Sequence, residues 1–302
     1  MTSRADQPVG ILIVDKPGGM TSRAVVDRVL RWFPRGTRAG HAGTLDPLAT
    51  GVLVVCLGSA TRLVEFIQRM KKTYRARLLL GATSPTDDAE GEISYQPAAP
   101  APTEASVRHH LEQLIGQREQ TPPSFSAAKV NGQRAYRLAR TGKAPALVSK
   151  LVQIETVQLI DYCYPHLEIE VICGKGTYIR SIARDLGQQM GTGALIQSLR
   201  RTRIGPFAAA DSVPLEANAA FVERKLLPLA AAAAELPSVV AGSDALALFR
   251  TGRAVDLNML AITGTLPDQK AEVAVFDELR RLAVLARLDP SQRTLAPRKV
   301  FV

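Results

Sequence analysis

One carboxylate stands out in the stretch Gly40–Gly51, whose sequence is GHAGTLDPLATG. Three glycines and a proline within this stretch predict a tightly bent loop. Pro47 also keeps the backbone of Asp46 away from the helical region. The loop should therefore present the carboxylate of Asp46 and the imidazole of His41 from a stiff frame. Alternatively, Asp46 is a turn residue that accepts hydrogen bonds from nearby backbone amides.

The histidines and cysteines predict no metal site. Three histidines lie outside this loop, and no metal-binding spacing connects them to His41; they are His109, His110 and His166. The cysteines are odd in number and have no C-x-x-C spacing, which argues against a disulfide framework and a zinc finger; they are Cys56, Cys163 and Cys173. Cys56 and Cys173 each end an apolar run, so we expect both to be small buried residues.

A second stretch, Cys173–Arg180, has the sequence CGKGTYIR and predicts a strand, a glycine turn and a helix. Thr177 can cap this helix, whose buried face would contain Ile179, Ile182, Ala183 and Leu186. A helix N-terminus reached through glycines suits an anion, either a phosphate or a carboxylate. Arg180 would sit in the first turn, where the helix dipole disfavours a cation. That placement makes sense if Arg180 pairs with an acid from elsewhere; otherwise Arg180 is exposed to solvent.

Basic residues gather in three further segments. Lys71–Arg77 surrounds Tyr74 with cations at the start of a predicted strand. This mixture suits nucleic acid, with cations for phosphates and a ring for a base, or an edge strand protected by charge. The cluster Leu199–Arg203 suits phosphates or a solvated face, and the basic residues of Lys129–Lys143 suit the backbone of an RNA. The formal net charge of +10 at pH 7 is typical of proteins that bind a polyanion, although solubility alone is the alternative explanation.

Strands and helices are mixed irregularly in the larger part of the chain, which favours an α+β fold over a regular βαβ alternation. Strands are predicted over Ile11–Val14, Val52–Leu57, Tyr74–Leu80 and Leu167–Val171. Helices are predicted after Thr21 or Ser22, after Ser59, and over Glu104–Ile115. The alanine-rich stretch Leu226–Leu236 is either a short helix or a linker.

The C-terminal part of the chain has a different residue pattern, with short apolar runs typical of strands. Val273–Phe276 and Leu282–Leu288 are apolar runs that predict a hairpin, so we place a small β-rich domain from about Ser238 onward. The N-terminus shows no signal peptide, and no apolar stretch reaches transmembrane length. We therefore expect a cytoplasmic protein without a membrane partner.

Four motifs in order resemble those of the TruB tRNA pseudouridine synthases. They are GHAGTLDPLATGVLVVCLG at Gly40–Gly58, KTY at Lys72–Tyr74, GKGTYIR at Gly174–Arg180 and LRRTRIGPF at Leu199–Phe207. The resemblance implies a pseudouridine synthase fold over residues 1–237, with a mixed, mostly antiparallel sheet and a central cleft. It also implies a PUA-like β-barrel over residues 238–302. The segment at about 122–150 resembles the insertion that grips the T arm of tRNA in the stand-alone bacterial enzymes.

The resemblance also implies roles for individual residues. Asp46 matches the nucleophile, Arg180 matches its ion-pair partner, and Tyr74 matches the residue that stacks on the target base. Further residues match positions that bind the substrate; they are His41, Tyr178, Leu199, Asp88, Lys16 and Arg200. Asp88 belongs to a turn in which Pro85 replaces the first acid that is usual in the family.

The implied reaction is the isomerisation of the uridine at tRNA position 55 to pseudouridine. The C1′–N1 bond breaks, the base turns, and a bond re-forms through C5, so no cofactor is required. The expected partner is the T arm of tRNA, bound by a monomer without a guide RNA. The base must be flipped out of its stack. Asp46 must be ionised, which burial opposes and Arg180 favours.

Two alternatives to this reaction are open. One is a non-catalytic RNA-binding or RNA-folding protein, which the basic charge suits equally well. The other is a glycosidase-like enzyme, which usually needs two acids across the scissile bond, whereas only one plausible acid is found here.

Overall fold

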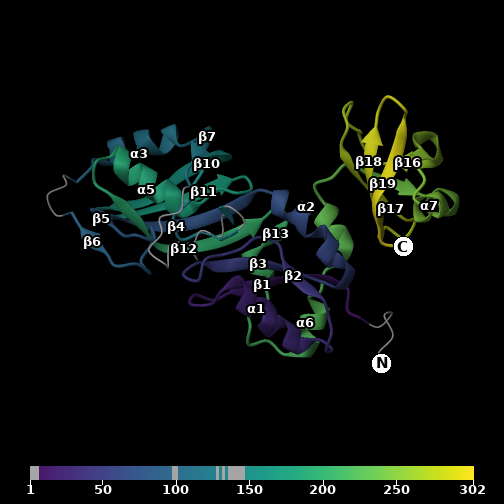
Figure 1. The fold of residues 1–302 in the computed structure, drawn as a ribbon, viewed down its shortest axis with the longest axis horizontal. Helices are drawn as coiled ribbons and strands as arrows, with labels where there is room; N and C mark the ends of the chain where they lie inside the picture. Colours follow the sequence, from purple (N-terminus) through teal and green to yellow (C-terminus); the bar gives the residue numbers. More distant parts are fainter. Residues whose placement is uncertain (1–6, 97–100, 127–128, 131–132, 135–146) are drawn as a thin grey trace.

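The computed structural model describes residues 7–96, 101–126, 129–130, 133–134 and 147–302 (Figure 1). Its larger sheet has nine strands. Across the sheet they are β1 (Gly10–Lys16), β3 (Thr50–Leu57), β12 (Ala194–Ile204), β4 (Lys72–Leu80), β11 (His166–Cys173), β10 (Lys150–Cys163) and β7 (Gly116–Gln120), with β2 (Ala39–His41) paired to β3 and β13 (Phe207–Ala208) paired to β12. Neighbouring strands run antiparallel, except that β3 and β12 run parallel. The expected mixed, mostly antiparallel sheet is confirmed.

The strands β1 and β3 are apolar along almost their whole length because both of their faces are buried. On one face, Leu12 and Val14 pack in a cluster with α1 (Ser22–Val29) and α6 (Ala219–Arg224). On the other face, Ile11 and Ile13 pack in a cluster with α2 (Val64–Arg69). Cys56 of β3 is buried in this second cluster, as the sequence predicted.

The helices cover the two ends of the sheet. α1 begins after Thr21, whose hydroxyl oxygen accepts a hydrogen bond from the amide of Ala24 at 3.1 Å, so the predicted cap is confirmed. α3 (Glu104–Gln113) and α5 (Ile179–Gln189) cover the other end, where their apolar faces pack against β4, β10 and β11. Figure 1 shows α1 and α6 together near β1, and α3 and α5 together near β10. The middle strands β12 and β4 lie between these two ends.

One local prediction is wrong, and one alternative that the sequence left open is excluded. Ser59 does not cap a helix, because residues Gly58–Leu63 form a 3₁₀ segment, η3, and α2 starts only at Val64. Gly58 turns the chain directly after β3 with a φ of +58°, and the Thr61 hydroxyl donates back to its carbonyl, which favours the tighter winding. Lys71–Arg77 is not an edge strand, because β4 has hydrogen-bonded neighbours on both sides.

The alanine-rich stretch Leu226–Leu236 contains a 3₁₀ segment, η5 (Leu229–Ala233). Its side chains Ala232 and Ala233 are buried in the same cluster as α2. Just before it, the backbones of Leu227 and Ile11 exchange two hydrogen bonds of 2.8 and 2.9 Å. The stretch is therefore attached to β1 before the chain enters the second sheet.

The second sheet has six strands and contains the hairpin that the sequence predicted. Across the sheet they are β15 (Val255–Asp256), β19 (Thr294–Val300), β18 (Leu282–Asp289), β17 (Glu272–Phe276), β14 (Ser238–Ala241) and β16 (Leu260–Ile262). It is accompanied by α7 (Ser243–Arg250) and η6 (Leu257–Met259). The hairpin turn between β17 and β18 places Arg280 at a φ of +60°.

The six-stranded sheet packs against α2 of the larger part (Figure 1). Arg69 of α2 forms an ion pair of 2.6 Å with Glu272, and Arg62 donates a 2.6 Å hydrogen bond to the carbonyl of Val300. Lys299 forms an ion pair with Glu65 of α2. Buried apolar residues of both sheets share one cluster, so this contact is a packed interface.

Short elements complete the described part of the chain. They are η2 (Leu30–Trp32), β5 (Ala82–Thr83), β6 (Ser94–Tyr95), β8 (Lys129–Val130), β9 (Gln133–Arg134) and η4 (Ala209–Asp211). The basic segment Lys129–Lys143 lies mostly outside the described residues; β8 and β9, which are described, pair antiparallel. Over the described ranges, no helix is both long and apolar enough to span a membrane.

Candidate active site

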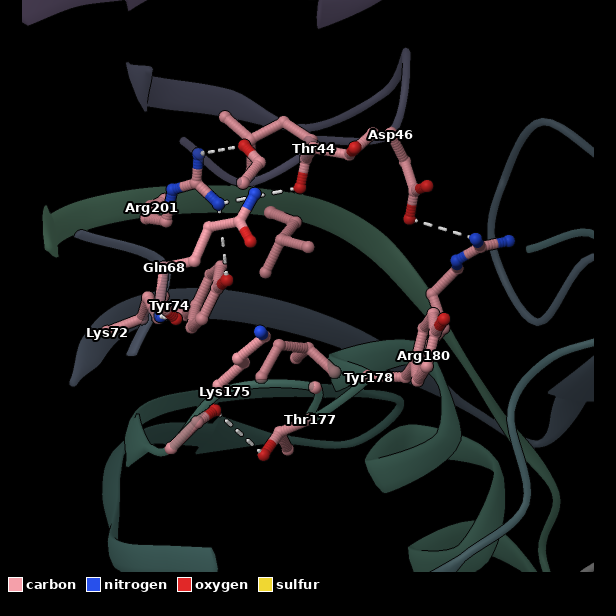
Figure 2. A pocket seen from close by; sticks show the side chains of 16 residues that line it. Thr44, Asp46, Gln68, Lys72, Tyr74, Lys175, Thr177, Tyr178, Arg180 and Arg201 are labelled. Atoms are coloured by element: carbon pink, nitrogen blue, oxygen red, sulfur yellow. Dashed lines mark hydrogen bonds and ion pairs between the residues drawn. The ribbon is translucent and has the colours of Figure 1, made fainter. Parts of the chain in front are cut away.

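A pocket of about 240 Å³ opens at the middle of the nine-stranded sheet, where β4 and β12 are neighbours (Figure 2). Its lining comes from parts of the chain that are distant in sequence: the loop Gly43–Asp46, the strands β4 and β12, and the turn that leads into α5. Five residues that the sequence singled out meet here; they are Asp46, Tyr74, Tyr178, Arg180 and Leu199. The expected central cleft is confirmed.

Arg180 lies between two carboxylates at one end of this pocket. Its Nη2 atom is 2.9 Å from Oδ2 of Asp46, and its Nη1 atom is 3.2 Å from Oδ2 of Asp88. The same guanidinium donates to the carbonyl oxygens of Thr86 and Phe125, each at 2.9 Å. Arg180 is only 4% exposed. The prediction that it pairs with an acid from elsewhere is confirmed, and the solvent-exposed alternative is wrong.

The carboxyl group of Asp46 is half-buried and points toward Arg180 (Figure 2). Burial raises the pKa of Asp46 above its usual value, Arg180 opposes this shift without cancelling it, and the charge of Asp88 adds to it. Within the described residues, the carboxylate bonds to Arg180 and to no loop amide, so the turn-residue alternative is wrong. Asp46 is therefore fixed in place but is ionised only in less acidic solution than an exposed aspartate.

Lys16 and Ser22 hold the loop that carries Asp46 through hydrogen bonds to its backbone. The Lys16 ammonium donates to the carbonyl oxygens of Pro47 at 3.0 Å and Ala49 at 2.6 Å. The Ser22 hydroxyl accepts from the amide of Leu45 at 2.8 Å and lies 3.1 Å from its carbonyl oxygen. Lys16 is completely buried. Lys16 therefore supports the loop, and burial lowers its pKa to about 8.

Arg201, not Arg200, reaches the pocket. Successive side chains of a strand point to opposite faces, and Arg200 pairs with Asp15 at 2.8 Å instead of lining the pocket. The Arg201 guanidinium donates to the carbonyl of Gly43 at 3.0 Å and lies 3.5 Å from the Tyr74 hydroxyl. It is 1% exposed. The sequence carried a signal for this difference: in a strand, Arg201 lies on the same face as Leu199, and Arg200 lies on the opposite face.

Gly51 explains how β3 and β12 come so close beside the pocket. It pairs with Arg201 in the parallel part of the sheet and has a φ of +97°. A Cβ atom at this position would lie 2.2 Å from the Arg201 carbonyl oxygen. Only glycine allows this approach. Gly51, at the end of the Asp46 loop, therefore lets β12 bring Arg201 next to that loop.

Tyr178 is positioned by a residue that the sequence did not reveal. The Oε1 atom of Gln120 accepts from the amide of Tyr178 at 2.8 Å, and its Nε2 atom donates to the Tyr178 carbonyl at 3.0 Å. The predicted Thr177 cap is wrong, because the Thr177 hydroxyl donates to the carbonyl of Gly174 instead. Gln120, at the end of β7, supplies the side-chain acceptor at the start of α5 in place of Thr177. No local pattern around Gln120 indicates this long-range contact.

Two further predicted site residues, His41 and Asp88, lie around the pocket and not on its surface. His41 is on β2, paired with Val55 of β3. Asp88 is buried behind Arg180, and its Oδ1 atom accepts from the Thr86 hydroxyl at 2.6 Å. Leu199 does line the pocket, together with residues that the sequence analysis did not assign there; they include Gln68, Lys72, Lys175 and Thr177. No cluster of metal-ligating side chains occurs in the part of the chain that the structure describes.

Two solved structures of similar fold place this architecture in a known class. A chain of a Cbf5–Nop10–Gar1 complex superposes with a TM-score of 0.75 at 24% identity, covering 97% of this chain and 85% of that chain. A chain of an H/ACA RNP bound to a substrate RNA containing 2′-deoxyuridine gives a TM-score of 0.74 at 23% identity, with the same coverage of 97% and 85%. The fold is the expected pseudouridine synthase fold.

Sequence comparison identifies the family. Residues 31–179 match the TruB family pseudouridylate synthase N-terminal domain, and residues 180–229 match the tRNA pseudouridylate synthase B C-terminal domain. A tRNA pseudouridine synthase B of Ruegeria sp. (strain TM1040) is 46% identical over 236 residues, 76% of this chain and 78% of the relative. The one from Xanthomonas campestris pv. campestris (strain 8004) is 37% identical over 298 residues, 97% of this chain and 94% of the relative. The protein belongs to the TruB family of pseudouridylate synthases.

Proposed function

We propose that the protein converts the uridine at position 55 in the T loop of tRNA into pseudouridine, with Asp46 as the nucleophile. One observation carries this proposal: Asp46, its partner Arg180 and the ring of Tyr74 line one pocket although they come from three distant segments. The names of the relatives, tRNA pseudouridine synthase B, support tRNA as the substrate. The net charge of +10 suits a polyanionic partner.

The reaction breaks the C1′–N1 bond, turns the base and joins C1′ to C5; the C5 proton leaves and N1 takes up a proton. Atoms are rearranged within one nucleotide, so the reaction consumes no oxidant, reductant or group donor. The Asp46 carboxylate can attack C1′ or C6; we favour the route through a glycal, in which Asp46 also removes the C2′ proton. Each route needs an ionised Asp46, and Arg180 supports that state at a distance of 2.9 Å.

Tyr74 supplies the surface on which a flipped uracil would stack. Its ring lines the pocket and is 8% exposed, so only a small part of it faces the cavity. Flipping a base costs a few kcal/mol, and stacking on an aromatic ring returns roughly 1–3 kcal/mol. Tyr178 and Leu199 close the same space. Contacts to phosphates would supply the remaining binding energy.

The rest of the chain serves RNA binding in this proposal. Residues 1–237 form the catalytic unit, and residues 238–302 form a PUA-like RNA-binding unit. The insertion at about 122–150 grips the T arm, which removes the need for a guide RNA, and the protein acts as a monomer in the cytoplasm. The described start of the insertion contacts the site directly, since the Phe125 carbonyl accepts a hydrogen bond from Arg180.

A T-arm stem-loop carrying C5-tritiated uridine tests the proposed reaction. Release of tritium with formation of pseudouridine supports the isomerase. Free uracil would instead indicate a glycosidase. Unchanged RNA that is nevertheless bound would indicate the second candidate function, a non-catalytic RNA-binding protein, which the basic charge also suits.

A further inference from the structure

The end of the pocket away from Arg180 contains three cations, Lys72, Lys175 and Arg201. Lys72 is 6% exposed and Arg201 is 1% exposed. Among the described residues, none of the three forms an ion pair with a carboxylate, although the pocket's other cation, Arg180, has two such partners. Positive charge is thus uncompensated at this end of the pocket.

The two buried cations are held in place by neutral groups. Arg201 donates to the carbonyls of Val52 at 2.8 Å and Gly43 at 3.0 Å. The Lys72 ammonium donates to the carbonyls of Gln68 and Met70. These bonds occupy some of the donors but leave the charges without a counter-ion, which is costly in a buried position. Burial lowers the pKa of Lys72 to about 8, and the nearby charge of Arg201 contributes to the shift.

Lys175 is the exposed member of the group. It sits on the turn between β11 and α5, and Gly176 directly after it has a φ of +90°, a conformation that favours glycine. Figure 2 shows its amine pointing into the pocket, into the space between Tyr74 and Tyr178. Within the described chain, the Lys175 ammonium forms no hydrogen bond or ion pair. An anion that enters the pocket can therefore reach Lys175 without displacing a protein partner.

We propose that this end of the pocket binds a phosphodiester group of the substrate RNA, next to the flipped uridine, with Lys175 as the direct contact. Lys72 and Arg201 supply the positive field behind it. The inference rests on the proposed function, because a nucleotide in the pocket brings a phosphate on each side of its sugar. Lysine binds phosphate as a point charge, and a single exposed ammonium over two buried cations matches one anionic group.

A double-mutant cycle between protein and RNA tests this subsite. The phosphates around the target uridine of a T-arm stem-loop are replaced one at a time by neutral methylphosphonates. Affinity and kcat/KM are measured with the wild type, with Lys175→Met, and with Lys225→Met as a matched control. Lys225 follows α6, outside the pocket lining. Lys175→Arg tests whether the charge alone restores binding, and thermal melting checks that each variant folds.

One charged hydrogen bond is worth about tenfold or more in affinity. Lys175→Met should therefore weaken binding about tenfold and reduce the slope of log Kd against log salt by about 0.7. At one phosphate, the methylphosphonate should weaken binding to the wild type and to Lys225→Met but not to Lys175→Met. Lys175→Arg should recover most of the loss.

Two results overturn the subsite. One is equal loss in wild type and Lys175→Met at every methylphosphonate. The other is a site that binds only free anions. In that case inorganic phosphate would raise the melting temperature of the wild type but not of Lys175→Met, and no methylphosphonate position would show coupling to Lys175. Failure of the proposed function is distinct, because binding coupled to Lys175 without any pseudouridine would leave the subsite standing. Pseudouridine formation without coupling would remove the subsite alone.

Discussion

Arg180 holds Asp46 at 2.9 Å through Nη2, the same atom that donates to the Phe125 carbonyl. Its Nη1 atom faces Asp88 and the Thr86 carbonyl. The guanidinium therefore keeps most of its partners when the Asp46 carboxylate moves or reacts. Arg180 is therefore a fixed positive charge beside Asp46, so changes in the protonation of Asp46 can be studied without a change at Arg180.

The raised pKa of Asp46 predicts the acidic limb of the pH–rate profile. Because the ionised carboxylate is the reactive form, kcat/KM should fall as pH drops through this raised pKa, above the range of an ordinary aspartate. The Asp88 charge contributes to the shift, so Asp88→Asn should move the limb to lower pH. The profile is measured under single-turnover conditions. A limb that stays in place in Asp88→Asn would contradict this account of the charges.

Tyr74 should act through its ring more than through its hydroxyl. The hydroxyl lies 3.5 Å from Arg201, at the limit of a hydrogen bond. Tyr74→Phe should therefore retain most activity, whereas Tyr74→Ala should lose the stacking surface, worth roughly 1–3 kcal/mol or about five- to 150-fold in rate. Rates on the T-arm stem-loop provide the comparison. Equal losses in the two variants would assign the hydroxyl a part in the chemistry.

Gln120 should stabilise both the fold and the catalytic step. Gln120→Leu removes the hydrogen-bond partner of the Tyr178 amide and one of the two donors to the Tyr178 carbonyl, which keeps its bond from the Ile182 amide. The unsatisfied amide should cost about 1–3 kcal/mol. The free energy of unfolding from urea titration should fall, and kcat should fall more than KM rises. Gln117→Leu, at an exposed position of the same strand, is the matched control. Similar effects of both variants would remove the special role of Gln120.

The buried ammonium of Lys16 predicts how stability depends on alkaline pH. Its pKa is lowered to about 8 in the folded protein, from 10.5. Between these values the unfolded chain binds more protons, so the free energy of unfolding should rise with pH through this window. Lys16→Met should show a smaller rise than the wild type between pH 8 and 10. Denaturant titrations at several pH values measure the difference, and parallel curves would contradict the prediction.

Much of the fold follows from patterns within single segments. Apolar runs predict β1 and β3 because both of their faces are buried, and Thr21 predicts the start of α1 because a hydroxyl cap is a local interaction. The 3₁₀ winding after Gly58 was missed, since it depends on a hydroxyl bond and a left-handed glycine that helix periodicity does not express. The central place of β4 depends on strand order, which no single segment encodes.

The residues of the candidate site also fall into those that the sequence predicted and those that depend on tertiary contacts. Motif resemblance selected Asp46, Tyr74, Tyr178 and Arg180, and the structure brings them into one pocket. Lys16 and Arg200 were assigned to substrate, but their surroundings are set by tertiary contacts: loop carbonyls for Lys16 and Asp15 for Arg200. Gln120 was missed because its partners lie across the sheet in the α5 turn.

The role of Asp46 as the nucleophile is tested most directly by the activity of Asp46→Asn on a T-arm stem-loop. Asparagine keeps the size of the side chain but removes the charge and the nucleophilic oxygen. Thermal melting checks folding, because loss of the Arg180 partner can destabilise the pocket, and Asp211→Asn at an exposed position serves as control. Asp46→Asn should bind RNA within a few-fold of wild-type affinity and form no pseudouridine. A folded, RNA-binding Asp46→Asn protein that forms pseudouridine at a near-normal rate would show that Asp46 is not the nucleophile.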